Sequence, residues 1–144
     1  MQNDEGIVVE ELNTLLRGTY MGIRTLEHYI QKTDNQQLKQ QFQRMQQEEK
    51  QNANKLAERI QNLNGAPADS EGFTGAIHSY MHKWTTPKES KEMIEQAIKG
   101  MDNYGVAYAE EVVKGDIDPE SKRIVEEVIN TNRNHADQLK QIQF

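Results

Sequence analysis

The segment from Leu38 to Leu63 limits the fold of this chain more than any other stretch. Its apolar residues recur at alternating steps of four and three, a spacing that keeps them on one face of a helix. They are Leu38, Phe42, Met45, Leu56 and Leu63. The same series passes through Glu49 and Asn52, so an acid and an amide occupy core positions in the middle of a long helix. The apolar stripe predicts packing against other helices, and its polar midpoint needs its own explanation.

The composition favours a bundle of such helices. The chain has 144 residues, the length of one domain, and we expect residues 1–144 to form a single domain. Hydrophobic residues make up 35% and charged residues 28%, proportions that suit long helices with one buried stripe and a wide solvated face.

Charge and composition also exclude several classes of partner. The net charge is −6 and no cluster of Lys and Arg stands out, so we expect binding to neither nucleic acid nor an anionic membrane. The chain has no cysteine, which excludes disulfides, thiolate zinc sites and cysteine nucleophiles. No apolar run reaches the roughly 20 residues that span a bilayer, and the N-terminal residues lack the pattern of a signal peptide. We therefore expect a soluble, cytoplasmic protein.

Apolar periodicity and turn residues predict an all-α fold with four helices. The expected helices cover residues 7–32, 35–64, 87–114 and 119–142, with a long crossover at 65–86. Two short turns separated by a long crossover make helices two and three parallel, as in ferritin-like four-helix bundles. The predicted architecture is two antiparallel hairpins joined by the crossover.

Capping residues predict where the helices begin and end. The expected N-terminal caps are, in chain order, Asn3 or Asp4, then Thr33 or Asp34, then Thr86, then Asp118. Pro87 and Pro119 would take the first helical positions, and Glu89 would complete a capping box in the third helix. Gly65 is expected in the left-handed conformation that ends the second helix, and Gly115 is expected to end the third.

In both predicted hairpins, the core stripes of the helices carry mostly polar residues at the same distance from the turn. Thr19 and Glu49 each lie about 15 residues from the first tight turn, and Met101 and Asn132 lie about 15 residues from the second. If the hairpins pack with their ends level, one layer forms at the middle of the bundle. Its expected members are Thr19, Glu49, Asn52, Met101, Asn132 and His135.

Several phrases of the sequence resemble a small bacterial ferritin-like family catalogued as a domain of unknown function. They are LNTLLRGTYMGI, FQRMQQEEKQNA, IKGMDNYG, GDIDPES and RNHADQL, spread over nearly the whole chain. The resemblance implies a ferritin-like bundle. In di-iron and di-manganese proteins of that fold, one Glu from each of helices one and three and a Glu-x-x-His from each of the other two hold the metals at the midplane.

Transferred to this sequence, the metal pattern is broken. Thr19 and Met101 stand where the single glutamates would be, and Asn52 and Asn132 replace a histidine and a glutamate. Of the six positions, Glu49 and His135 alone match. Thr, Met and Asn supply no negative charge for two cations, so we predict that no di-iron centre forms.

Two functions remain open from the sequence. In the first, the protein is a non-catalytic structural or protein-interaction module without a cofactor. The habit of helical bundles leads us to expect a homodimer, with an unidentified protein as a further partner. Its midplane would be a buried polar layer in which Glu49 bonds His135, while Thr19, Asn52, Asn132 and Tyr104 satisfy the rest. In the second, the protein binds metal or is an oxidoreductase-type ferritin-like protein with a reduced iron, manganese or zinc site. The residues of that site would be Glu49 and His135, with an Asn oxygen and water.

Other candidate ligands carry less support. His78 and His82 lie four residues apart in the crossover, a spacing that can hold zinc on a helix. His28 lies beside Glu27, and two further acids are one residue away from a core stripe. Those two are Glu48 and Asp102. We expect these acids to be solvated, and nothing in the sequence suggests a catalytic nucleophile or a phosphate-binding loop.

Overall fold

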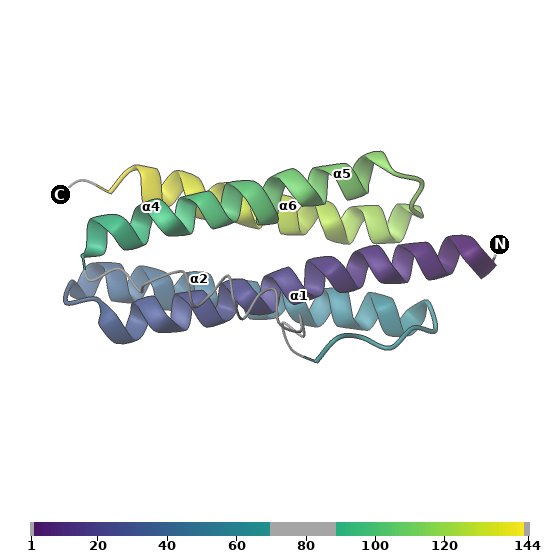
Figure 1. Ribbon diagram of the computed structural model, residues 1–144, viewed down its shortest axis with the longest axis horizontal. Helices are drawn as coiled ribbons and strands as arrows, with labels where there is room; N and C mark the ends of the chain where they lie inside the picture. The colour runs from purple at the N-terminus through teal and green to yellow at the C-terminus, as the bar shows by residue number, and fades with distance from the viewer. Residues whose placement is uncertain (1, 70–88, 143–144) are drawn as a thin grey trace.

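The computed structural model describes residues 2–69 and 89–142, all of them helical or in short connections (Figure 1). The helices are α1 Gln2–Lys32, α2 Gln36–Asn62, α4 Ser90–Gly100, a π-helical segment η1 Met101–Tyr108, α5 Ala109–Lys114 and α6 Pro119–Lys140. α4, η1 and α5 follow one another without a break, so they act as one long helix. The predicted all-α, ferritin-like four-helix bundle is confirmed.

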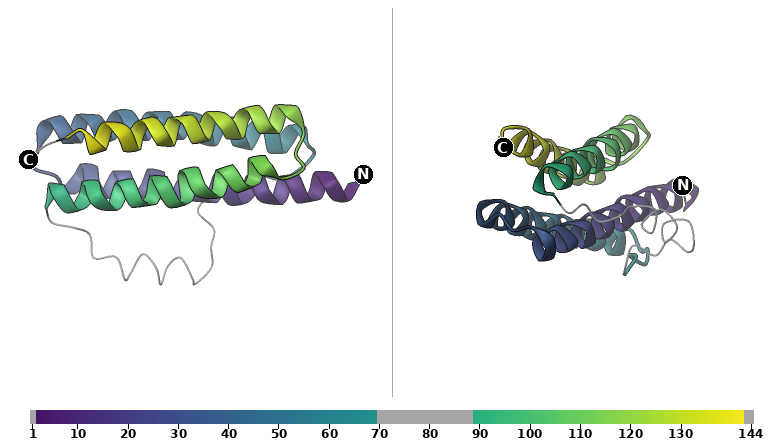
Figure 2. Two further views of the ribbon diagram at one scale, coloured as in Figure 1. Left: turned by 90° about the horizontal axis from the view of Figure 1, so that it is seen from above. Right: turned by 60° about the vertical axis from the view of Figure 1, so that its left-hand side comes forward.

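The two hairpins lie side by side along their full length. α1 pairs with α2, and the α4–η1–α5 run pairs with α6 (Figure 1). Figure 2 shows the other two contacts of the bundle, in which α2 lies along α6 and α1 lies along the α4–η1–α5 run. α2 and α4 start at the same end of the bundle and run parallel, as the long crossover predicts. The crossover itself falls mostly outside the described residues.

Apolar side chains fill the bundle on either side of its midpoint. One core cluster lies towards the start of α1, and a second lies towards the α1–α2 turn. The first contains Leu12, Leu16, Leu56, Ile60, Val112, Val125 and Val128, among others. The second contains Leu26, Tyr29, Phe42, Met45, Met93, Met101 and Leu139, among others. The helices therefore share an apolar core that divides into two clusters.

The predicted starts of α1 and α2 were wrong in detail. α1 begins at Gln2, so Asn3 and Asp4 lie inside the helix rather than ahead of its first turn. The cap of α2 is Asn35, whose side chain accepts a hydrogen bond from the Leu38 amide at 3.0 Å. Thr33 supports this cap from outside, because its Oγ1 accepts from the Asn35 amide. Thr33, Asp34 and Asn35 all have suitable side chains, and the sequence alone does not separate them.

The end of α2 also differs from the prediction. Asn64, with φ 66°, takes the left-handed conformation that was assigned to Gly65. The Gly65 amide donates to the Ile60 carbonyl and the Asn64 amide donates to the Gln61 carbonyl, both at 2.9 Å. These bonds form a Schellman motif, which satisfies the last carbonyls of the helix. The chain then lies against α1, where the Asn13 amide donates to the Ala66 carbonyl and accepts from the Ala68 amide.

The start of the third helix shifts as well, whereas that of the fourth is as predicted. Glu89 has extended backbone and precedes α4, so it does not complete a capping box; Thr86 and Pro87 lie outside the described residues. α5 ends at Gly115. Asp118 caps α6, and its side chain accepts from the Ser121 amide at 2.9 Å, with Pro119 in the first turn. Arg59, near the end of α2, donates to Asp118 at 2.6 Å and to Ser121, so it ties α2 to the start of α6.

Candidate functional site

All six predicted layer residues are buried, and they lie between the two apolar clusters or at their border. They are Thr19, Glu49, Asn52, Met101, Asn132 and His135. Met101 packs as part of the second apolar cluster, and the other five are polar. The burial of these residues agrees with their positions on the predicted core stripes.

His135 is the centre of the layer, and carboxylates flank both of its ring nitrogens. Its Nε2 lies 2.7 Å from Oε2 of Glu48, and its Nδ1 lies 3.3 Å from Oε1 of Glu49. The side chain of His135 is 1% exposed and that of Glu49 is 6% exposed, whereas Glu48 reaches the imidazole from a side chain that is 57% exposed. Both acids belong to α2, so the contacts join α2 to α6 at mid-height.

The surroundings of His135 favour its charged form. Burial on its own lowers the pKa of a histidine, but the attraction of the Glu49 and Glu48 carboxylates outweighs burial here and raises the pKa of His135 above its ordinary value. A protonated imidazole would donate from both nitrogens, one to each acid. The layer thus places one imidazole between two carboxylates, one buried and one exposed.

The remaining polar groups do not complete the expected network. The Thr19 hydroxyl donates to the Leu15 carbonyl, and the Asn132 amide donates to the Val128 carbonyl, each on its own helix at 2.9 Å. Three buried side-chain atoms within the described residues have no hydrogen-bond partner. They are Oε1 of Glu49, Nδ2 of Asn52 and Nδ1 of His135. The Glu49–His135 contact is close enough for an ion pair but poorly aligned for a hydrogen bond, and the side chain of Tyr104 lies outside the described part of the chain.

The residues of the layer do not fit a two-metal centre. Across residues 2–69 and 89–142, no three His, Asp or Glu side chains gather in a way that could hold a metal ion. Glu48 and Glu49 contact opposite sides of the imidazole, so they do not converge on one point. A dinuclear site needs several carboxylates to balance two cations, and this layer offers a single buried one.

One feature of the layer is not predictable from periodicity. η1 replaces the α-helical pattern over Met101–Tyr108, level with the polar residues. Within it, Gly105 approaches α6 so closely that an added Cβ would stand 2.4 Å from Cγ of Asn132. π-helical segments insert an extra residue into a helix and often mark functional sites. Gly105, the second glycine of IKGMDNYG, was the available sequence signal for this close approach.

The other candidate ligands lie apart from one another. Asp102 is at the surface near Lys140, 3.6 Å away, and His28 is exposed. Glu27 is exposed and accepts hydrogen bonds from Gln31 and Gln46, which lower its pKa. His78 and His82 lie outside the described residues. Glu48 was expected to be solvated and is largely exposed, but its contact with His135 was missed.

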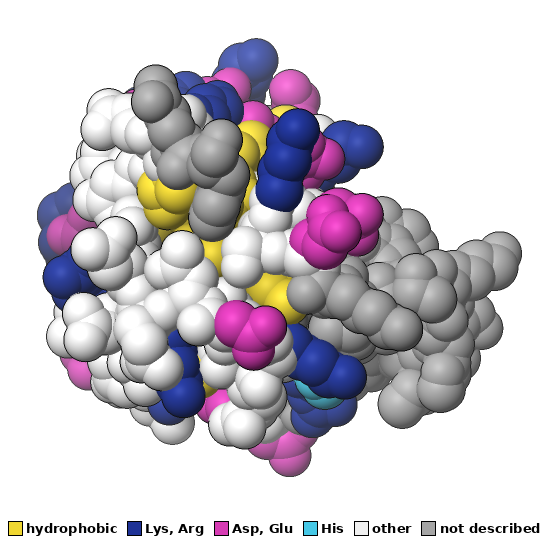
Figure 3. All heavy atoms as spheres, turned by 90° about the vertical axis from the view of Figure 1, so that its left-hand side faces the viewer, with side chains coloured by type: hydrophobic (Ala, Val, Ile, Leu, Met, Phe, Trp, Pro, Cys, Tyr) yellow, Lys and Arg dark blue, Asp and Glu magenta, His cyan; other side chains and the backbone are white. Residues whose placement is uncertain are grey.

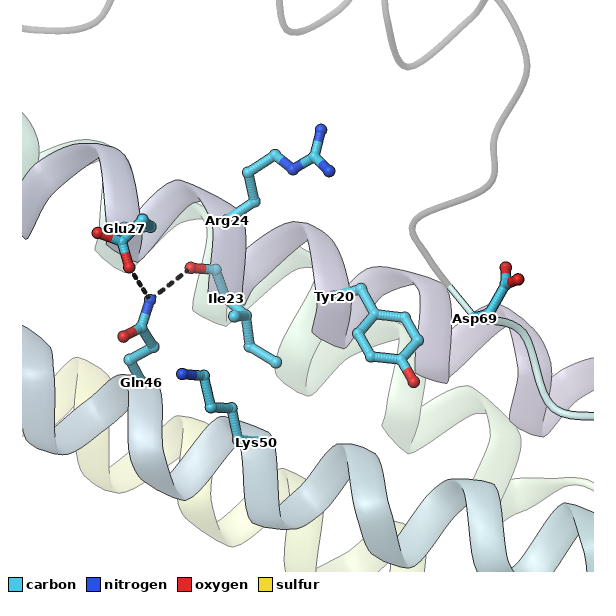
Figure 4. Close-up of a pocket in the computed structure, with 7 residues that line it drawn as sticks. All are labelled: Tyr20, Ile23, Arg24, Glu27, Gln46, Lys50 and Asp69. Atoms are coloured by element: carbon cyan, nitrogen blue, oxygen red, sulfur yellow. Dashed lines mark hydrogen bonds between the residues drawn. The ribbon is translucent and has the colours of Figure 1, made fainter.

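A separate pocket opens on the outer face of α1 and α2. It has a volume of about 330 Å³ and is lined by Tyr20, Ile23, Arg24, Glu27, Gln46, Lys50 and Asp69 (Figure 4). The buried Gln46 closes one part of it by donating to the Ile23 carbonyl and to Glu27. The lining carries acids and bases together, so it offers no field of one sign to a charged ligand.

Charges of both signs lie at the end of the bundle that carries the α1–α2 turn. On this face, Lys and Arg side chains are interspersed with Asp and Glu, and a few hydrophobic side chains reach the surface (Figure 3). None of the described helices combines the length and the apolar character that a membrane span requires.

Comparison with solved structures supports the fold. A dodecameric thioferritin from Bacteroides fragilis, a bacterioferritin-related protein, superimposes with a TM-score of 0.78 at 16% identity, over 95% of this chain and 84% of that one. A two-domain protein from Anabaena variabilis, with DJ-1/ThiJ/PfpI-like and ferritin-like domains, superimposes with a TM-score of 0.75 at 18% identity over 94% of this chain. The present chain spans 35% of the Anabaena protein's length.

Sequence comparison identifies the family. No curated protein matches the chain. The family profile for a domain of unknown function, DUF2383, matches residues 7–115, from α1 to the end of α5, and the match stops before Asn132 and His135 in α6. The chain belongs to the DUF2383 family, and its fold is ferritin-like.

Proposed function

We propose that this protein is a non-catalytic ferritin-like bundle that acts as a structural or protein-interaction module. The observation that carries the proposal is the position of His135 between the carboxylates of Glu48 and Glu49. In this arrangement the residues left at the metal positions serve to bind helices together. Thr19, Met101 and the two asparagines could not support two-metal chemistry.

The layer stabilises one alignment of α2 against α6. A buried polar group in a bundle costs stability when it faces apolar side chains, so it favours the alignment in which it meets its partner. Sliding α2 by one turn would place Glu49 against the leucines and valines of an apolar cluster. A bundle with a single alignment presents the same outer surface to every partner, as an interaction module requires.

A double-mutant cycle tests this role. We would measure the free energy of unfolding in EDTA for the wild type, Glu49→Gln, His135→Gln and the double variant. We expect the two changes to be coupled by about 1–3 kcal/mol, since each single change leaves the other buried group unpaired.

The matched control is Lys55 with Glu127, which also joins α2 to α6 but at the surface, with side chains 51% and 35% exposed. Its cycle should give a coupling between zero and about 1 kcal/mol. Additive effects at Glu49 and His135, no larger in coupling than this control, would contradict the structural role.

We also propose that the protein self-associates as a homodimer and works in the cytoplasm. Self-association has support from the thioferritin relative, which is dodecameric, and the lack of cysteine is compatible with a reducing compartment. Light scattering should give twice the chain mass of 16.6 kDa. A mass that stays at one chain across the concentration range would exclude the dimer.

A further inference from the structure

The outer side of α2 carries little charge. α2 packs against α1 and α6, which leaves a third side of the helix in solvent. Exposed residues recur along this side at alternating steps of four and three, so they form one continuous stripe. Two of them are charged, Arg44 and Glu58, and the others are amides. The amides are Gln40, Gln47, Gln51, Asn54 and Gln61. We call these residues together the amide stripe.

The exposed side of α4 shows the opposite pattern. All of the exposed residues of α4 are charged, namely Lys91, Glu92, Glu95 and Lys99. The centres of protein interfaces are depleted in charged residues, because a charge costs more free energy to remove from water than an amide does. A side-chain amide also donates and accepts hydrogen bonds, so one row of amides can pair with another. The amide stripe is therefore a surface that another row of amides covers at low cost.

The two charges of the amide stripe are placed symmetrically about Gln51. Arg44 lies seven residues before Gln51 and Glu58 lies seven residues after it, about 10 Å along the helix axis in each direction. When a second α2 lies antiparallel across the stripe, with a two-fold axis at Gln51, each Arg44 faces Glu58 of the partner subunit. Among the ion pairs of the described residues, none involves Arg44 or Glu58. The stripe thus complements a second copy of itself in charge.

We propose that the amide stripe is the surface on which a second copy of this chain binds, with the two α2 helices antiparallel. The inference rests on the proposed homodimer and locates its interface. The 27 residues of α2 extend about 40 Å, which provides a long line of contact. Two ion pairs between Arg44 and Glu58 flank the central amides. An isologous contact of this kind closes on itself, so the assembly stops at two copies.

Charge reversal tests this interface. We would measure the dissociation constant of the untagged full chain at low salt by analytical ultracentrifugation, for the wild type, Arg44→Glu and Glu58→Arg. Each change replaces two attractive contacts per dimer by two repulsive ones, so we expect the dissociation constant to rise about 10- to 100-fold. The double variant has opposite charges across the interface again. Its dissociation constant should return close to that of the wild type.

A mixture of the two single variants gives a sharper test. In a mixed dimer, one chain carries acids at positions 44 and 58 and the other carries bases at both. Both contacts across the two-fold axis are then attractive. We expect the mixture to form heterodimers at a concentration where each variant alone is mostly monomeric. Added salt should reduce this preference, because the contacts lie at the surface.

Control variants separate the amide stripe from the effect of net charge. Lys99→Glu and Glu95→Arg, on the exposed side of α4, change the net charge by the same amounts and should leave the dissociation constant unchanged. Circular dichroism checks that every variant is folded.

Two failures are distinguishable. A dimeric wild type whose dissociation constant is unchanged in both stripe variants, or changes equally in the controls, would overturn the location of the interface and leave the homodimer standing. A wild type that stays monomeric would refute the homodimer and this inference together.

Discussion

Gly105 lies directly against the side chain of Asn132, at the point where the π-helical segment crosses α6. A Cβ on Gly105 would stand 2.4 Å from Cγ, 2.6 Å from Oδ1 and 2.7 Å from Nδ2 of Asn132. The amide of Asn132 is buried and hydrogen-bonded to Val128, so it cannot simply turn away. The missing side chain of the glycine is thus what allows η1 and α6, the two halves of the second hairpin, to meet at the layer.

Gly105→Ala should therefore destabilise the protein. We expect a loss of about 1–3 kcal/mol in the free energy of unfolding, because the added methyl group overpacks the core. Gly100→Ala is the matched control in the same helical run, where an added Cβ meets nothing within 4 Å. It should be neutral or stabilising by up to about 1 kcal/mol. Urea denaturation measures both, and equal effects at the two glycines would contradict the contact.

The same contact predicts a compensating pair. Asn132→Ala removes the group that an alanine at 105 would strike, so the double variant Gly105→Ala with Asn132→Ala should be more stable than the sum of the single changes predicts. The expected coupling is about 1–2 kcal/mol, measured by the same denaturation experiment. Strict additivity would mean that the backbone of η1 moves to accommodate the methyl group.

The cap of α6 should make stability depend on acid pH. Partial burial tends to raise the pKa of Asp118, but hydrogen bonds from Ser121 and the charge of Arg59 more than offset it and lower this pKa. A depressed carboxyl pKa stabilises the fold above the unfolded pKa, and this contribution is lost as pH falls through the folded pKa.

Asp118→Asn keeps a capping side chain and removes the ion pair, so it isolates that effect. At pH 7 we expect the variant to be less stable by a few tenths to about 1 kcal/mol. As pH falls through the depressed pKa of the folded state, the difference should shrink towards zero, since the wild-type acid is then protonated. Thermal melts over this pH range provide the test. A stability difference between the variant and the wild type that does not change with pH would show that the ion pair between Arg59 and Asp118 contributes nothing to stability.

Asn64 and Gly65 should respond in opposite directions to substitution. Asn64 has φ 66°, which glycine adopts at lower cost, so Asn64→Gly should stabilise by a few tenths of a kcal/mol to about 1 kcal/mol. At Gly65 an added Cβ would stand 2.6 Å from Cγ1 of Val9, so Gly65→Ala should destabilise. We expect the Tm of Asn64→Gly to lie above that of the wild type and the Tm of Gly65→Ala to lie below it. A destabilised Asn64→Gly variant would argue against the left-handed cap.

Restoring the missing ligands should create a two-metal site. The variant combines Thr19→Glu, Asn52→His, Met101→Glu and Asn132→Glu. We expect it to bind two equivalents of iron, because it regains the carboxylate charge that two cations need. The crowded contact between position 132 and Gly105 is the weakest point of this design, so folding is checked first by circular dichroism. A folded variant that binds no more metal than the wild type would contradict the assignment of these positions to one layer.

Much of the fold could be predicted because helix spacing and turn lengths restrict it strongly. Apolar periodicity assigned Glu49 and His135 to core faces, and counting about 15 residues from each turn set Glu49 level with Asn132 without any knowledge of the neighbours. The cap of α6 was predictable because Asp118 precedes a proline. At the α1–α2 turn three adjacent residues could cap, and the choice of Asn35 depends on where the turn ends.

The missed features depend on contacts between helices. Glu48 is one residue away from the core stripe, so periodicity assigns it to solvent, yet its long side chain reaches back to Nε2 of His135. η1 replaces the α-helical hydrogen-bond pattern where the helix meets Asn132, and no local propensity signals that change. Gly65 looked like the left-handed residue because glycine usually is, but its lack of a side chain is needed against Val9.

The direction of the helices has a mechanical consequence. α1 begins at one end of the bundle and α6 ends at the other (Figure 1). The 31 residues of α1 extend about 45 Å at 1.5 Å per residue. Two groups attached to the start of α1 and the end of α6 are therefore held apart by a rod of about that length. The bundle can serve as a rigid spacer of known span between two fused proteins or two fluorophores.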